Sequence, residues 1–81
     1  MRVLYFAWLR ERIGVGREEI ETSAPDVAAL IEELRARDEG HALAFADLSA
    51  VRVAVDQEAA EFDASLANVR EVAFFPPVTG G

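Results

Sequence analysis

One stretch of this chain has a helical hydrophobic period, and it limits what the rest of the chain can fold into. Its apolar residues recur at the i, i+3, i+4, i+7 spacing that buries one face of a helix. They are Val27, Leu30, Ile31 and Leu34. Pro25-Asp26 stands before them, and aspartate is a preferred N-cap residue. We expect Gly40 to end this helix. A short helical turn is expected between residues 41 and 48.

The other segments have the composition of strands. β-branched and aromatic residues or a two-residue alternation mark residues 2–9, 17–22, 51–56, 59–62 and 71–75. A helical turn at residues 9–13 follows the first of them. Residues 17–22 are charged, as edge strands often are. This order predicts an α+β fold in which a mixed five-stranded sheet packs on one main helix. A right-handed crossover makes the first and last strands parallel, which is the ubiquitin-like β-grasp arrangement.

The first and last predicted strands are apolar on both faces, although one helix covers only one face of a sheet. The two-residue alternation separates Val3 and Tyr5 from Leu4 and Phe6, and Phe74 from Phe75. An uncovered aromatic patch marks a protein–protein interface more often than anything else. The alternative is that loops fold over this face. The alternation of residues does not decide between the two.

The chain runs from its last predicted strand into Pro76-Pro77 and stops at Gly80-Gly81. The prolines fix φ and favour extended conformations before them, so the tail is stiff at its root. Residues 76–81 reach about 20 Å at about 3.3 Å per residue. An end without side chains can enter a narrow channel with its carboxylate leading. We therefore predict a folded domain over residues 1–75 and a flexible tail over residues 76–81 that reacts at its terminus. A frayed end without function is the alternative.

Composition limits where reactive groups can lie. The chain has no cysteine, which excludes disulfides, thiolate metal sites and a side-chain persulfide. All eight basic residues are arginine, so no lysine is present for ubiquitin-style chain formation. The net charge of −7 disfavours nucleic acid and anionic membranes and favours a basic partner surface. No apolar run approaches the ~20 residues that span a bilayer, and a cytoplasmic location is expected.

No constellation of residues predicts catalysis by the domain itself. His41 is the single histidine and is expected to be structural. The acidic pairs are interpreted as solvated faces: Glu18-Glu19, Glu32-Glu33 and Asp38-Glu39. There is no phosphate loop or metal-ligand spacing, so no metal site is predicted. Arg10-Glu11-Arg12 is interpreted as a solvated turn, and contact between Arg10 and an acidic partner residue is the alternative.

The end of the chain, FFPPVTGG, resembles the C-terminus of the molybdopterin synthase small subunits, a family of ubiquitin-like sulfur carriers. The resemblance extends to VLYFAWLRERIG at residues 3–14 and to the helix start at Pro25-Asp26-Val27. It recurs at residues 54–57 and 62–66. Asp56 stands where that family usually has an asparagine.

The resemblance implies a carrier that reacts at Gly81. An ATP-using adenylyltransferase, similar to those that activate ubiquitin, would adenylate Gly81, and sulfur would then replace AMP to give a thiocarboxylate. That group would donate sulfur to a cyclic pyranopterin precursor held by a large catalytic subunit, forming the molybdopterin dithiolene. The implied assembly is a heterotetramer with two copies of each subunit. The carrier itself would bind no cofactor stably and would not be catalytic alone.

The same resemblance implies the site residues. Gly81 is the reacting centre, and Gly80 lets the backbone approach closely. The implied partner-binding residues are Phe6, Arg10, Phe75, Pro76, Pro77, Val78 and Thr79. The resemblance also assigns Phe6 and Phe75 to the partner face, and Val3, Tyr5 and Phe74 to the core. Three alternatives stay open: a sulfur carrier for thiazole synthesis, a ubiquitin-like protein modifier, and a plain interaction domain.

Overall fold

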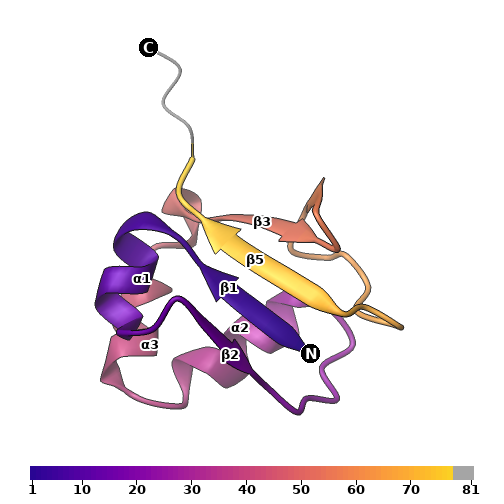
Figure 1. The fold of residues 1–81 in the computed structure, drawn as a ribbon, viewed down its shortest axis with the longest axis horizontal. Helices are drawn as coiled ribbons and strands as arrows, with labels where there is room; N and C mark the ends of the chain where they lie inside the picture. The colour runs from indigo at the N-terminus through magenta and orange to yellow at the C-terminus, as the bar shows by residue number, and fades with distance from the viewer. Residues whose placement is uncertain (78–81) are drawn as a thin grey trace.

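The sheet has the strand order β2-β1-β5-β3-β4 in the computed structural model, which describes residues 1–77 (Figure 1). Its strands are β1 (Arg2–Tyr5), β2 (Arg17–Glu19), β3 (Arg52–Val55), β4 (Glu58–Ala60) and β5 (Glu71–Phe75). β1 and β5 pair in parallel, and the other pairs are antiparallel. The predicted mixed five-stranded sheet, with its first and last strands parallel, is confirmed.

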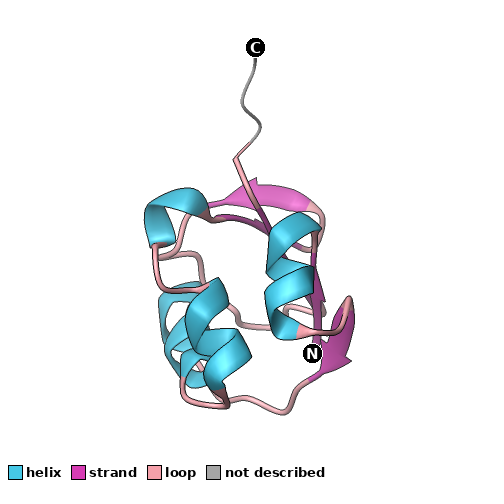
Figure 2. Cartoon of the chain, turned by 90° about the vertical axis from the view of Figure 1, so that its left-hand side faces the viewer, coloured by secondary structure: helices cyan, strands magenta, loops and turns pink. Residues whose placement is uncertain are grey.

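The helices lie on one side of this sheet (Figure 2). Within the described residues they are α1 (Ala7–Ile13), α2 (Val27–Arg35), α3 (Glu39–Ala44) and a single 3-10 turn at Leu48–Ala50. None of the helices in residues 1–77 is long and apolar enough to cross a bilayer.

The main helix, α2, begins as the sequence predicts. Asp26 Oδ1 accepts a hydrogen bond from the backbone N–H of Ala29 at 2.8 Å, so aspartate is the N-cap. All four residues of the apolar stripe are buried. Helix and sheet therefore share one core, which also takes in Phe45 and Leu66.

The prediction that Gly40 ends this helix was wrong. α2 ends at Arg35, and Ala36 caps it in an ordinary right-handed conformation, so no glycine is needed there. Asp38 then accepts a hydrogen bond from His41 N and starts α3, with Gly40 inside it. A Cβ on Gly40 would lie 2.6 Å from the carbonyl oxygen of Arg12, so this glycine allows α3 to approach α1 closely.

The first strand is shorter than the predicted residues 2–9. β2 pairs with residues 2–4 of β1, and the N–H of Tyr5 donates to the carbonyl of Gly16. Continuing the strand would leave the next residues without a partner on that side, whereas a helix satisfies its own backbone groups. The chain accordingly turns at Ala7, whose φ is 54°, and enters α1, which buries Leu9. The strand predicted at residues 17–22 is likewise shortened, to β2, and the one predicted at residues 59–62 is shorter and begins one residue earlier, as β4.

Candidate functional site

One row of cross-strand neighbours crosses the face of the sheet that lies away from the helices. The row is Arg17, Leu4, Ala73, Ala54 and Ala59, one residue from each of the five strands. Three of the five are alanines, so the middle of this face is flat and apolar. We call it the outer face. Within residues 1–77 no helix covers it (Figure 2).

Two aromatic residues border the outer face where β1 and β5 end. Tyr5 and Phe74 are register partners on the inner face and are buried at 1% and 0% exposure. The residue that follows each of them belongs to the other side: Phe6 is 48% exposed and Phe75 is half-buried. The prediction that places Val3, Tyr5 and Phe74 in the core is confirmed, and Phe6 and Phe75 lie outside that core.

Each of these two aromatic residues lines a shallow hollow with arginine at its edge. Phe6 shares a hollow of about 520 Å³ with Arg10 and Arg17. Phe75 shares one of about 500 Å³ with Arg52 and Glu61, next to the edge strand β4. The hollow beside Phe6, with apolar surface and two guanidinium groups, fits a partner surface with apolar and acidic side chains. The net charge of −7, from which a basic partner was expected, is opposite in sign to the two arginines beside Phe6.

The cluster Arg10-Glu11-Arg12 is more ordered than the predicted solvated turn. The guanidinium of Arg12 lies 4.5 Å from the centre of the Trp8 ring, a cation–π contact. Arg10 is exposed and folds over Gly16, where an added Cβ would lie 3.2 Å from its Nε. Arg10 thus reaches the hollow beside Phe6, whereas Arg12 turns away toward α3, whose Leu43 carbonyl lies 3.5 Å away.

The root of the tail leaves the sheet beside these aromatic residues. β5 ends at Phe75, and the half-buried Pro76 and Pro77 follow it. Figure 1 shows the arrow of β5 ending near the start of α1, where Phe6 is the N-cap. The four remaining predicted site residues, Val78, Thr79, Gly80 and Gly81, lie outside the described residues.

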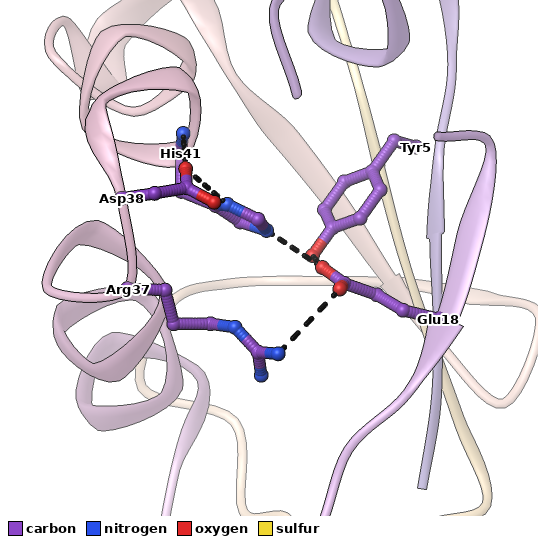
Figure 3. Close-up of polar contacts among 5 residues, drawn as sticks. All are labelled: Tyr5, Glu18, Arg37, Asp38 and His41. Carbon is purple, nitrogen blue, oxygen red and sulfur yellow. Dashed lines mark hydrogen bonds and ion pairs between the residues drawn. The ribbon is translucent and has the colours of Figure 1, made fainter. Parts of the chain in front are cut away.

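A second group of polar side chains lies on the inner side of the sheet (Figure 3). His41 is buried between two carboxylates, with Nε2 2.6 Å from Glu18 Oε2 and Nδ1 2.8 Å from Asp38 Oδ1. The hydroxyl of Tyr5 donates to the same Glu18 oxygen at 2.6 Å, and Arg37 lies 3.8 Å from the other. The structural role predicted for His41 is confirmed.

The interpretation of Glu18 as a solvated residue was wrong, because its side chain is only 19% exposed, whereas Asp38 is exposed as predicted, at 57%. Burial alone would raise the pKa of Glu18, but hydrogen bonds from Tyr5 and His41 outweigh it and lower that pKa. The backbone N–H of His41, then its ring, lower the pKa of Asp38. Burial and the bond to Glu18 raise the pKa of Tyr5. No sequence signal joins these residues, because they come from separate segments of the chain.

The described part of the chain offers no catalytic arrangement of its own. Residues 1–77 contain no group of three histidine, aspartate or glutamate side chains that could hold a metal ion. Neither hollow beside the two aromatic residues contains a histidine; Tyr5 lines the first and Glu61 the second. The outer face is thus an apolar surface with the root of the tail at its edge.

Comparison with known proteins identifies relatives of this chain. A family model described as the ThiS family matches residues 3–81. A protein of Escherichia coli K12 named molybdopterin synthase sulfur carrier subunit is 42% identical over 81 residues, covering 100% of this chain and 99% of its own. A protein of Haemophilus influenzae with the same name is 37% identical, with the same coverage.

Solved structures agree with the fold. SAMP1 from Haloferax volcanii has a TM-score of 0.74 at 25% identity and covers 100% of this chain and 98% of its own. A putative molybdopterin converting factor, subunit 1, from Pyrococcus furiosus has a TM-score of 0.72 at 32% identity, with 95% of each chain covered. The predicted ubiquitin-like β-grasp fold is confirmed.

Proposed function

The chain belongs to the ThiS family, and from its named relatives we propose that it is the sulfur-carrier subunit of a molybdopterin synthase. Two relatives that match it over its whole length carry that name. The structural observation that carries the proposal is the position of the tail root, because Phe75 and Pro76 lie at the edge of an uncovered outer face. A thiazole-synthesis carrier and a protein modifier are not favoured by these relatives.

The proposed chemistry takes place at Gly81. A free carboxylate is ionised at neutral pH and is a poor electrophile, so it needs activation. An activating enzyme joins a carboxylate oxygen to the α-phosphorus of ATP, and pyrophosphate leaves. A sulfur nucleophile then displaces AMP at the carbonyl carbon and leaves a thiocarboxylate. The absence of cysteine supports this route, since no side-chain thiol is present to carry the sulfur.

The proposed division of labour gives this chain positioning and gives its partner acid–base catalysis. The outer face docks on a large subunit, with Phe6, Arg10 and Phe75 at the contact. The tail, residues 76–81, enters that subunit, where the thiocarboxylate attacks a cyclic pyranopterin precursor. Pro76 and Pro77 fix the exit angle, Val78 and Thr79 contact the channel, and Gly80 permits close approach.

The proposed assembly is a cytoplasmic heterotetramer with two copies of each subunit. The activating adenylyltransferase binds the same carrier at a different stage of the cycle. Any anionic substrate must find its cationic pocket on the large subunit, because this chain carries a net charge of −7.

The test is a mass measurement on the intact chain. Incubation with an activating enzyme, ATP and a sulfur donor should raise the mass by the difference between sulfur and oxygen, localised to the last peptide. A mass gain elsewhere in the chain would contradict the proposal. An isopeptide to lysines of other proteins would favour the modifier instead.

A chain without Gly81 is the matched control for position. It should fold and dock, yet sulfur transfer should fall at least ~100-fold, because the reacting carbon is withdrawn by about 3 Å. Gly80→Val should also fail to transfer sulfur, since its side chain would meet the channel wall. Comparable transfer by the shortened chain would mean that the chemistry lies in the body of the domain.

A further inference from the structure

A cluster of aromatic rings lies directly beneath the two aromatic residues of the outer face. Tyr5 and Phe74 stack with their ring centres 6.3 Å apart and their planes at 14°. Phe45 contacts Phe74 edge-on at 4.9 Å. Because Phe6 follows Tyr5 and Phe75 follows Phe74, the position of these buried rings sets the backbone from which the exposed ones project.

His41 forms the polar end of this ring cluster. Its ring meets Tyr5 edge-on at 5.9 Å, and both side chains bond the same oxygen of Glu18. Each ring nitrogen of His41 has a carboxylate partner, Glu18 on one side and Asp38 on the other. Arg37, at 3.8 Å from Glu18, supplies a positive charge beside these two carboxylates.

We propose that His41 is a positioning residue for the docking face, acting through Glu18 and Tyr5. His41 holds the Glu18 carboxylate, and that carboxylate is the hydrogen-bond acceptor of the Tyr5 hydroxyl. Tyr5 is 1% exposed, and its hydrogen bond to Glu18 holds one end of the buried ring in place, so a ring that loses this bond would shift. That shift moves Phe6 along the chain and Phe75 through the stacked Phe74.

A second contact leads from His41 to the same corner of the molecule. His41 lies in α3, which packs on α1, and Gly40 sits against the carbonyl of Arg12 at the end of α1. The N-terminal end of α1 is capped by Phe6, and Arg10 stands in its last turn. Both contacts therefore lead to α1, whose start borders the outer face.

The inference rests on the proposed function only for the identity of the docking partner. Its direct test compares the full chain with His41→Gln, and two milder variants keep the test decisive if that one does not fold. Tyr5→Phe removes one hydroxyl, and Glu18→Gln removes one charge while keeping the shape. Asp56→Ala is the control, because it loses hydrogen bonds to Arg70 N and Glu71 N at the other end of β5.

Two measurements are made on folded protein, well below each variant's unfolding temperature. In the free chain, the backbone amide signals of Phe6 and Phe75 should shift in His41→Gln and Glu18→Gln and stay unchanged in Asp56→Ala. In Tyr5→Phe only the Phe75 signal is read, because Phe6 is the chain neighbour of Tyr5. With the large catalytic subunit of a molybdopterin synthase, Tyr5→Phe and Glu18→Gln should each raise Kd about five- to tenfold. The double variant should add little to the larger single effect, since both act through one chain of contacts.

The outcomes separate the two proposals. Unchanged Phe6 and Phe75 signals, or a Kd no higher than that of Asp56→Ala, would overturn the positioning role. Additive effects in the double variant would also overturn it. A wild-type chain that does not bind the large subunit would refute the proposed function, and the amide signals of the free chain would still decide the role of His41.

Discussion

Phe6 and Phe75 are aromatic, like the residues before them, but they are more exposed. Tyr5 is 1% exposed and Phe6 is 48% exposed, although both are aromatic and adjacent. The two-residue period of a pleated strand is fixed by backbone geometry, so the sequence separates the two sides, and the family resemblance indicated which of them is buried. The left-handed φ of 54° at Ala7 was not predictable, because alanine has no preference for it. That turn decides where Phe6 points.

Phe6→Ala and Phe75→Ala should each weaken assembly with the large subunit by about 2 kcal/mol or more. The reason is that each truncation removes an aromatic anchor from the edge of an uncovered face. The measurement is a binding isotherm at equilibrium. The unfolding midpoint in urea should change little for Phe6→Ala, since Phe6 lies outside the core.

Leu43→Ala is the matched control for these variants. Leu43 is 56% exposed on α3, in the helix layer, so its truncation removes exposed apolar surface away from the outer face. Binding as weak as that of Phe6→Ala would mean that the partner contacts the helix side. Loss of folding by Phe75→Ala without a separate binding defect would return Phe75 to the core.

The elements of this chain were predictable to different degrees. β5 has the predicted bounds of residues 71–75, because a continuous apolar run in so short a chain is buried most readily as a strand of the sheet. α2 starts at its predicted cap, which is local chemistry. α3 was not predicted with its bounds, since Gly40 serves there for close packing against α1 and not as a helix stop. Such a role depends on tertiary contact that no local pattern reveals.

The hairpin between β3 and β4 carries a strain that a substitution can relieve. Val55 pairs with Glu58, so the turn has two residues, Asp56 and Gln57, with φ of 48° and 71°. Glycine adopts such angles without the cost that a side chain brings. Gln57→Gly should therefore raise the free energy of unfolding by about 0.5–1 kcal/mol, measured by urea denaturation.

The neighbouring residue of the same turn should respond in the opposite direction. Asp56 Oδ1 accepts hydrogen bonds from Arg70 N and Glu71 N, each at 3.0 Å, and so ties the hairpin to the start of β5. Asp56→Gly relieves the same kind of strain but loses both bonds, and a net loss of about 1 kcal/mol is expected. Equal stabilisation by both glycine variants would show that these two bonds contribute nothing.

At the scale of the whole molecule, the buried polar cluster joins parts that sequence patterns treat separately. Glu18 from β2 and His41 from α3 are 23 residues apart, and Tyr5 comes from β1. The sequence pattern does not reveal that these residues interact, because Glu18 stands beside Glu19 and is interpreted as part of a charged edge strand. Only the fold brings the inner face of β2 against α3.

This cluster predicts how stability depends on pH. The folded pKa values of Glu18 and Asp38 lie below the ordinary values of 4.5 and 3.8, so their contribution is present above those values and is lost as pH falls. The folded pKa of Tyr5 lies above the ordinary 10.0, so its contribution is present below pH 10.0 and is lost as pH rises. Urea midpoints should form a plateau between these limits.

Tyr5→Phe and Glu18→Gln separate the two limbs of this profile. The chain has one tyrosine and neither lysine nor cysteine, so Tyr5 is the side chain that dominates the alkaline limb. Tyr5→Phe should flatten that limb, and Glu18→Gln should flatten part of the acid limb. An alkaline limb that persists unchanged in Tyr5→Phe would contradict the assignment.

The parallel pairing of β1 and β5 also has a mechanical consequence. The start of β1 and the end of β5 lie at opposite ends of the pair, and β5 is bonded to β3 on its other side. A pull on Pro77 against the start of β1 therefore loads the β1–β5 bonds together, in shear, and does not unzip them one at a time. A tail withdrawn from an enzyme channel would thus draw the whole sheet behind it as one body, and the last strand would not be peeled away.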